Sequence, residues 1–312
     1  MTMKITTIVQ RLADAVHKKE DTLVHWDNEC ADDKLQNGRY GMALKYLSTG
    51  SKIVRYLISI SEPNFRIEKV DNTFVESFSE YLNLEGLKEN TVHFHLRNFS
   101  AMYHRKVRNY SENPFSLFNM RSCATRKRAF DKQTMLRIKV FNLKGKSSLV
   151  FARDLFLFSF YTQGMSFVDI AYLKKSDIKG GTIRYKRRKT GQPVTVILVP
   201  EAKEIIRRYK CKGSYVFPII VSDDPKTAYK QYRTGLATQN RRLKKIGKML
   251  GLDEPLTTYI ARHTWATLAQ NHGVPTSIIS HSLGHTSETT TRIYLGSMDT
   301  RLLAHYNRLT TR

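Results

Sequence analysis

The stretch Leu283–Tyr294 reads LGHTSETTTRIY, a histidine followed nine residues later by a tyrosine. Apolar spacing predicts helices over Pro275–Ser282 and Ser287–Tyr294, joined by a short turn that carries Gly284 and His285. A lone tyrosine at a helix end is usually a half-buried packing residue. Its phenol, with a pKa near 10, becomes a nucleophile only beside a base or cations. The neighbours of Tyr294 therefore decide its role.

Residues 257–269, just upstream, read TTYIARHTWATLA and predict a helix over Tyr259–Asn271 with Arg262 and His263 near its start. Consecutive helices with short turns can bring both of these side chains toward Tyr294. Imidazoles and a guanidinium around a phenol suit a phosphate group, because arginine binds two phosphate oxygens at once.

Residues 180–200 read GGTIRYKRRKTGQPVTVILVP, two β-prone runs around the turn-forming KTGQP. This pattern predicts a hairpin. Side chains on a strand alternate between its two sides, so Arg187 is expected on the same side as Lys189.

The rest of the chain is predicted to be helical. Asp71 is the expected N-cap of the third of four helices in the first half, over Ile5–His17, Gly41–Leu57, Asn72–Leu82 and Lys88–Val107. In the second half an apolar helix ends at Gly164, and further helices are expected over Lys132–Phe141, Pro200–Tyr209, Ala228–Leu250 and Asp299–Arg308.

A break in periodicity around Pro114 divides the chain into a helical domain over residues 1–110, a basic linker over 111–130 and a second domain over 131–312. The expected fold class is mainly α with a small β-hairpin or sheet in the C-terminal domain (α+β).

The charge of the chain favours a polyanionic partner. Lys and Arg number 52 against 27 Asp and Glu, a formal charge of +25. Nucleic acid relieves such self-repulsion, and a merely basic surface is the alternative. DNA contacts are expected from His95, Arg97, Arg105, Lys106, Arg108, Arg126, Lys127, Arg128, Arg184, Arg188, Arg241 and Arg242.

Other features exclude several classes of protein. Cys30, Cys123 and Cys211 lie far apart with no CxxC spacing, which argues against a disulfide framework or a thiolate zinc site, so no metal is expected. No apolar run is long enough to span a membrane, and the charged N-terminal residues do not resemble a signal peptide. A cytoplasmic location is expected.

Four segments in order, TQGMSFVDIAYLKKSDI (162–178), RRKTGQ (187–192), ARHTWAT and LGH with a tyrosine nine residues on, resemble the signature of the tyrosine recombinase (phage integrase) family. The resemblance implies a two-domain C-shaped clamp around double-stranded DNA. It also implies strand cleavage by Tyr294, giving a 3′-phosphotyrosine and a free 5′-hydroxyl, with neither metal nor ATP.

The same resemblance implies a role for each site residue. Arg262 would hold the non-bridging oxygens of the scissile phosphate, and Lys189 at the hairpin tip would protonate the leaving 5′-oxygen. His285 would hydrogen-bond the phosphate, and His263 would have a supporting or base-like role. Such donors stabilise the charge that develops in the transition state.

Two positions depart from the family pattern. Ser166 stands where the family has its first arginine, and Tyr259 stands where it has a histidine before the second. Arg187 is the candidate substitute cation, while the Ser166 hydroxyl and the polar tip of Tyr259 can still hydrogen-bond. The departures are similar to those of mobile-element integrases from Bacteroides-like bacteria.

Two alternatives remain open at this point: a catalytically decayed DNA-binding protein and a type IB topoisomerase-like enzyme. Recombination between two duplexes implies four protomers. The predicted helix over residues 299–308, with Leu302, Leu303 and Tyr306 on one side, is a candidate for docking on a neighbouring subunit or on its own domain. Asp169 is expected to form ion pairs with cationic neighbours.

Overall fold

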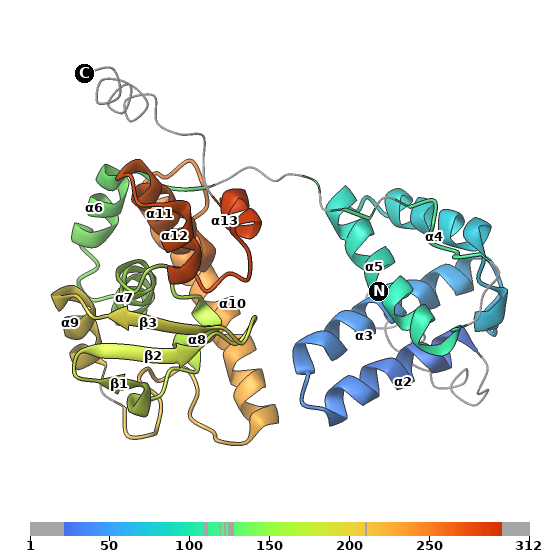
Figure 1. Cartoon of the computed structure of the whole chain (residues 1–312), viewed down its shortest axis with the longest axis horizontal. Helices are drawn as coiled ribbons and strands as arrows, with labels where there is room; N and C mark the ends of the chain where they lie inside the picture. Colours follow the sequence, from blue (N-terminus) through green and yellow to red (C-terminus); the bar gives the residue numbers. More distant parts are fainter. Residues whose placement is uncertain are drawn as a thin grey trace, which may run out of the picture. The chain divides into compact units, whose positions relative to one another are not determined.

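The computed structural model describes residues 22–108, 112–118, 120–121, 123, 128–209 and 211–294. Residues 292–294 are described by their backbone alone. The chain forms two compact units, Met1–Thr125 and Arg126–Arg312 (Figure 1). The boundary falls within residues 111–130. The helices expected over Ile5–His17 and Asp299–Arg308 lie outside the described residues.

Unit 1 is helical. Its elements are α2 (Leu23–Gln36), α3 (Tyr40–Ser59), the 3₁₀ turn η1 (Ile67–Lys69), α4 (Asn72–Leu84) and α5 (Glu89–Lys106). Helices α3, α4 and α5 confirm the sequence predictions. Asp71 caps α4 as expected, because its Oδ1 accepts a hydrogen bond from the backbone N–H of Phe74 at 2.7 Å.

The sequence did not predict α2. Its buried face holds Leu23, Cys30 and Ala31, but also Asp27 and Lys34. Charged side chains at buried positions interrupt the apolar repeat on which helix prediction depends.

Polar side chains also lie in the core of unit 1. His95 on α5 is 3% exposed, and its Nδ1 lies 3.0 Å from Oγ1 of Thr49 on α3. Burial lowers the pKa of His95 below its usual value. The prediction that His95 contacts DNA is wrong, because the side chain faces the core.

Unit 2 contains a small sheet and a larger set of helices. Its elements are α6 (Lys132–Val140), α7 (Ser147–Tyr161), α8 (Phe167–Ala171), η2 (Lys175–Asp177), β1 (Ile178–Lys179), β2 (Thr182–Lys186), β3 (Pro193–Ile197), α9 (Pro200–Arg208), α10 (Pro225–Met249), α11 (Thr258–Asn271), α12 (Thr276–Ser282) and α13 (Glu288–Tyr294). The expected mainly helical fold with a small sheet in the second half is confirmed.

Helix α7 is the centre of unit 2. It is mostly apolar, its residues from Leu149 to Tyr161 are buried or half-buried, and it contacts α6, α9, α10 and α11. The sheet is antiparallel in the order β1-β2-β3 (Figure 1). On β3 Val194 and Val196 are buried while Thr195 and Ile197 are exposed, the alternation of a half-covered strand. The two-residue β1 was too short to predict.

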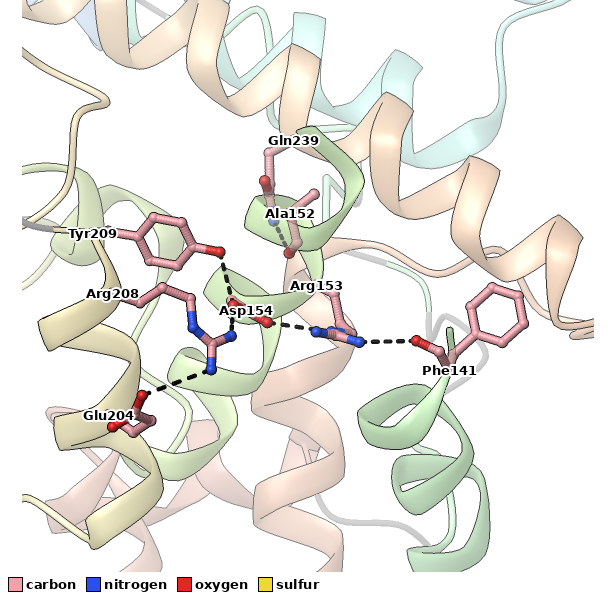
Figure 2. Close-up of polar contacts among 8 residues, drawn as sticks. All are labelled: Phe141, Ala152, Arg153, Asp154, Glu204, Arg208, Tyr209 and Gln239. Atoms are coloured by element: carbon pink, nitrogen blue, oxygen red, sulfur yellow. Dashed lines mark hydrogen bonds and ion pairs between the residues drawn. The ribbon is translucent and has the colours of Figure 1, made fainter. Parts of the chain in front are cut away.

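A buried carboxylate joins α7 to α9. Asp154, 2% exposed, accepts hydrogen bonds from Arg208 Nη1 at 2.5 Å, Tyr209 Oη at 2.7 Å and Arg153 Nε at 3.2 Å (Figure 2). Arg153 also donates to the carbonyl oxygen of Phe141 at 2.9 Å. Asp154 raises the pKa of Arg208 against the opposing effect of burial. Three donors therefore neutralise and hydrogen-bond one buried charge.

Candidate active site

Arg262 lies near the start of α11 and is 2% exposed. Its Nη1 donates to the carbonyl oxygen of Gly164 at 2.8 Å, and its Nη2 donates to the carbonyl oxygen of Leu283. Nη2 also lies 3.1 Å from Nε2 of His285. One guanidinium thus joins the turn after α7 to the turn between α12 and α13.

Two glycines with positive φ allow this close approach. A Cβ at Gly164 (φ +74°) would lie 2.9 Å from the Cα of Arg262, and a Cβ at Gly284 (φ +61°) would lie 2.8 Å from Cγ2 of Val194. Both contacts are shorter than a side chain tolerates, so backbone conformation and packing each require glycine here.

His285 is held at both ring nitrogens. Nε2 faces Arg262, and Nδ1 lies 2.8 Å from Oγ1 of Thr291. Burial, and then the positive charges of Arg262, Arg187 and Lys189, lower the pKa of His285 from 6.5 to about 3. The imidazole is therefore neutral in this site, with three cations around it.

The hairpin turn brings Arg187 into the site by a route different from the predicted one. Strand β2 ends at Lys186, and the N–H of Gly191 donates to the carbonyl oxygen of Arg187 at 2.7 Å. Lys189 therefore lies in the turn, so strand alternation does not relate its direction to that of Arg187. Lys189 is exposed, whereas Arg187 is buried.

Arg187 is 5% exposed, and its Nη1 donates to the carbonyl oxygen of Gly284 at 3.1 Å. Thr190 Oγ1 donates to the same oxygen at 3.1 Å. Among the described residues, Nε of Arg187 has no hydrogen-bond partner. Arg187 and Arg262 thus bind the carbonyl oxygens of adjacent residues in one turn, and Arg187 keeps a donor to spare.

Asp169 fixes the other side of the hairpin. Its Oδ2 accepts a hydrogen bond from Ser166 Oγ at 2.6 Å, and its Oδ1 accepts one from the backbone N–H of Arg188 at 2.9 Å. The Arg188 guanidinium lies instead over the ring of Tyr172, at 3.7 Å. The expectation that Asp169 pairs with a cation is therefore wrong: it accepts hydrogen bonds from the backbone amide of Arg188 and from the hydroxyl of Ser166.

Tyr259 and His263 form a pair on α11. Their rings meet edge to face with centroids 4.7 Å apart, and Tyr259 is 49% exposed. Tyr294 is the last residue of α13, and its side chain lies outside the described part of the structure. Thr291, one helical turn before it, is completely buried.

Sequence reasoning missed Thr291, Thr190, Tyr185 and the hydrogen bonds of Asp169. Burial raises the pKa of Tyr185, on β2, and the nearby Asp169 raises it further. A hydroxyl residue gives no sequence signal of its own. Gly284 did carry such a signal, because a glycine in a short turn indicates a positive φ or a close approach of the backbone.

The predicted DNA contacts fall into three groups. Arg105 pairs with Asp33 at 3.0 Å, Lys106 lies over the ring of Trp26 at 5.2 Å, and Arg97 donates to the carbonyl oxygen of Met120. Arg128, which pairs with Glu254 at 3.2 Å, completes this first group of residues that have a partner within the protein. The second group is exposed or half-exposed and comprises Arg108, Arg184, Arg188, Arg241 and Arg242. Arg126 and Lys127 lie outside the described residues.

One group in the described chain has metal-ligating side chains: Glu89, His93 and Cys123, whose ligand atoms lie within 4.8 Å of one another. Existing contacts explain it. His93 Nδ1 lies 2.8 Å from the carbonyl oxygen of Arg121, and Asn90 exchanges hydrogen bonds with the backbone of Cys123 at 2.8 and 3.1 Å. These contacts hold the segment around Arg121 and Cys123 against α5.

Family models match both units. The model described as Phage integrase family matches residues 140–301, more than half of the chain, and the model described as Phage integrase SAM-like domain matches residues 22–121. The chain belongs to the phage integrase family. None of the described helices is long and apolar enough to cross a membrane.

The curated relatives are named tyrosine recombinases. XerA of Saccharolobus solfataricus is 32% identical over 122 residues, which cover 39% of this chain and 37% of XerA. XerC of Syntrophus aciditrophicus is 28% identical, and the match covers 48% of this chain and 50% of XerC. XerD of Listeria monocytogenes is 22% identical over 280 residues, 81% of this chain and 88% of XerD. The first two matches thus span half or less of those relatives.

Solved structures share the fold. The Tn1549 transposon integrase in complex with a circular intermediate DNA has a TM-score of 0.64 at 16% identity, covering 92% of this chain and 99% of that one. A lambda integrase dimer bound to a COC′ core site has a TM-score of 0.63 at 18% identity, with coverages of 88% and 95%.

Proposed function

We propose that the chain is a site-specific DNA recombinase that cleaves and rejoins strands through a covalent bond to Tyr294. The phenol oxygen attacks the scissile phosphorus, the bond from phosphorus to the 5′-oxygen breaks, and Lys189 protonates that oxygen. The phenol proton passes to His263. A 5′-hydroxyl of a partner strand then reverses the step. The phosphotyrosine ester retains the energy of the broken linkage, so neither metal nor ATP is required.

The observation that carries this proposal is that Arg262 and Arg187 meet at one turn, where they donate to the carbonyl oxygens of Leu283 and Gly284 beside His285. Arg262, Arg187 and Lys189 come from α11 and the hairpin, and all three lower the pKa of His285. Charge of this kind, fixed before substrate arrives, stabilises a pentacovalent phosphate transition state without reorganisation.

In this proposal Arg187 replaces the arginine that the family has at the position of Ser166. Arg187 is buried, and it donates to the carbonyl oxygen of Gly284, next to the Leu283 carbonyl oxygen that Arg262 binds. Its Nε has no hydrogen-bond partner among the described residues. These three observations support the proposal.

The partner we propose is double-stranded DNA. The +25 charge supports it, and so do the integrase relatives solved on DNA. One of these is a lambda integrase tetramer bound to a Holliday junction, with a TM-score of 0.63. We propose that four protomers assemble on paired sites.

The test is covalent capture. A duplex selected by the protein from a random pool, nicked beside the cleavage position so that the cut end diffuses away, should trap the protein in a denaturant-resistant complex. Tyr294→Phe should bind the same duplex with equal affinity and form no such complex. Binding without any adduct from the wild-type chain would favour the decayed DNA-binding protein, and supercoil relaxation without recombinants would favour the topoisomerase.

The role of Lys189 has its own test. Lys189→Ala should lose cleavage of ordinary DNA and recover it on DNA whose 5′-bridging oxygen is sulfur, because a thiolate, with a parent pKa of about 8.5, leaves without protonation. Lys179→Ala, an exposed lysine on β1, is the matched control and should cleave both substrates normally.

A further inference from the structure

Thr291 places a buried hydroxyl against the site from the helix that carries the proposed nucleophile. Its side chain is 0% exposed, and its Oγ1 lies 2.8 Å from Nδ1 of His285. It precedes Tyr294 by one turn of α13. Side chains three residues apart lie on neighbouring parts of one helical face.

The direction of each hydrogen bond follows from the chemistry of the partners. A guanidinium can only donate, so Nε2 of His285 accepts from Nη2 of Arg262 at 3.1 Å. The neutral ring then carries its proton on Nδ1, and Thr291 Oγ1 must accept it. The lowered pKa of His285 agrees with a neutral ring.

We propose that Thr291 is a positioning residue for strand cleavage: its hydroxyl fixes the ring of His285 and thereby ties the nucleophile helix to Arg262. This rests on the function proposed above. Arg262, His285 and Thr291 form a chain of two hydrogen bonds that ends on α13. The arginine that would hold the phosphate and the helix that presents the attacking oxygen are thus kept in one geometry. Small errors in such placement slow chemistry strongly.

The substitution that isolates the hydroxyl is Thr291→Val. Valine has nearly the shape of threonine and fits the same buried space, but it lacks the hydroxyl that accepts from the N–H of His285. Thr291→Ser keeps the hydroxyl and loses only a methyl group. Thr289→Val, an exposed threonine on the same helix, controls for valine in α13.

The experiment measures the rate of covalent capture on the nicked duplex at saturating protein, with DNA affinity measured separately. Thr291→Val should cleave about tenfold more slowly, equivalent to roughly 1.4 kcal/mol in the barrier, with unchanged affinity. Thr291→Ser and Thr289→Val should stay within about twofold of the wild type, a difference well under that tenfold step. A wild-type rate in Thr291→Val, or an equal loss in Thr291→Ser, would overturn the proposal.

Nitrogen-15 NMR of histidine-labelled protein supplies a readout independent of cleavage. The Nδ1–H proton of His285, assigned by its loss in His285→Gln, should be visible and slow to exchange in the wild type and in Thr291→Ser. It should be lost to exchange in Thr291→Val. A protected Nδ1–H in Thr291→Val would contradict the proposed contact. This arm gives its answer even if the wild-type chain forms no adduct, an outcome that would count against the proposed function alone.

Discussion

Unit 2 contains two clusters of arginines whose partners differ. Arg153 and Arg208 both pair with the carboxylate of Asp154, and Arg208 also lies 3.9 Å from Glu204, so both guanidinium groups have anionic partners within the protein (Figure 2). The described partners of Arg187 and Arg262 are main-chain carbonyl oxygens and an imidazole. Carbonyl dipoles orient a guanidinium without cancelling its charge. The first cluster therefore stabilises the fold, and we propose that the second offers its positive charge to an anion.

The largest expected effect comes from breaking the cluster around Asp154. Asp154→Ala should lower the free energy of unfolding by about 3–5 kcal/mol, because it leaves buried donors without their shared acceptor. Urea unfolding of the full chain measures it. Glu204→Ala removes the exposed carboxylate 3.9 Å from Arg208 and should cost less than about 1 kcal/mol. Equal losses in the two variants would show that Asp154 contributes no more than a surface ion pair.

The next effect concerns the cluster of Arg187 and Arg262. Arg187→Ala should slow covalent capture by about 100-fold to 1,000-fold, the scale for one preorganised donor to a transition state. Arg207→Ala, an exposed arginine on α9 with 71% of its side chain accessible, controls for lost charge and should leave the rate unchanged. Full cleavage by Arg187→Ala, with cleavage abolished in Lys189→Ala, would remove Arg187 from the site.

A third prediction asks whether burial and the neighbouring cations together lower the pKa of His285. The pKa of His285 is about 3 in the folded chain and 6.5 in the unfolded chain. Below pH 6.5 the imidazole therefore binds a proton in the unfolded chain but not in the folded chain. The free energy of unfolding should decrease as the pH is lowered, by up to about 1 kcal/mol per pH unit. This is less than the full value of about 1.4 kcal/mol per pH unit for one proton, because the ring is partly exposed. His285→Gln should be less sensitive between pH 6.5 and 5. Parallel pH profiles for the two chains would contradict the shift; His95 is common to both and cancels.

The smallest effect extends the comparison to unit 1. Asp27 is 3% exposed, burial raises its pKa, and neither carboxylate oxygen has a hydrogen-bond partner among the described residues. Its folded state prefers the proton, so its cost to stability grows as pH rises above the unfolded value of 3.8. Asp27→Asn should stabilise the chain by about 1 kcal/mol at pH 7. Thermal unfolding should show that gain shrinking toward pH 4; a destabilised variant at pH 7 would refute it.

Much of the fold could be predicted because local signals agreed with the core. The cap at Asp71, the apolar α7 and the hairpin turn each follow from short-range chemistry. Helix α2 could not be predicted, since Asp27 and Lys34 on its buried face break the apolar repeat. Long-range packing, to which sequence periodicity is blind, sets those positions.

The site shows the same division. Sequence spacing identified Arg262, His285 and the hairpin cations, because the motifs themselves carry these residues. The proximity of Arg187 was expected from strand alternation, but it results from a turn that docks on Gly284. The contact between Thr291 and His285 depends on how two helices meet, which no local pattern records.

The carbonyl oxygen of Gly284 accepts hydrogen bonds from Arg187 and Thr190, which lie on either side of Arg188 and Lys189 in the hairpin turn. The same short loop leads directly into α13. A single carbonyl oxygen therefore connects the hairpin turn that carries Lys189, the proposed acid, to the loop that precedes α13. We expect a protomer whose α13 is displaced to lose attack by Tyr294 and leaving-group protonation by Lys189 together. Each subunit would then have both activities or neither.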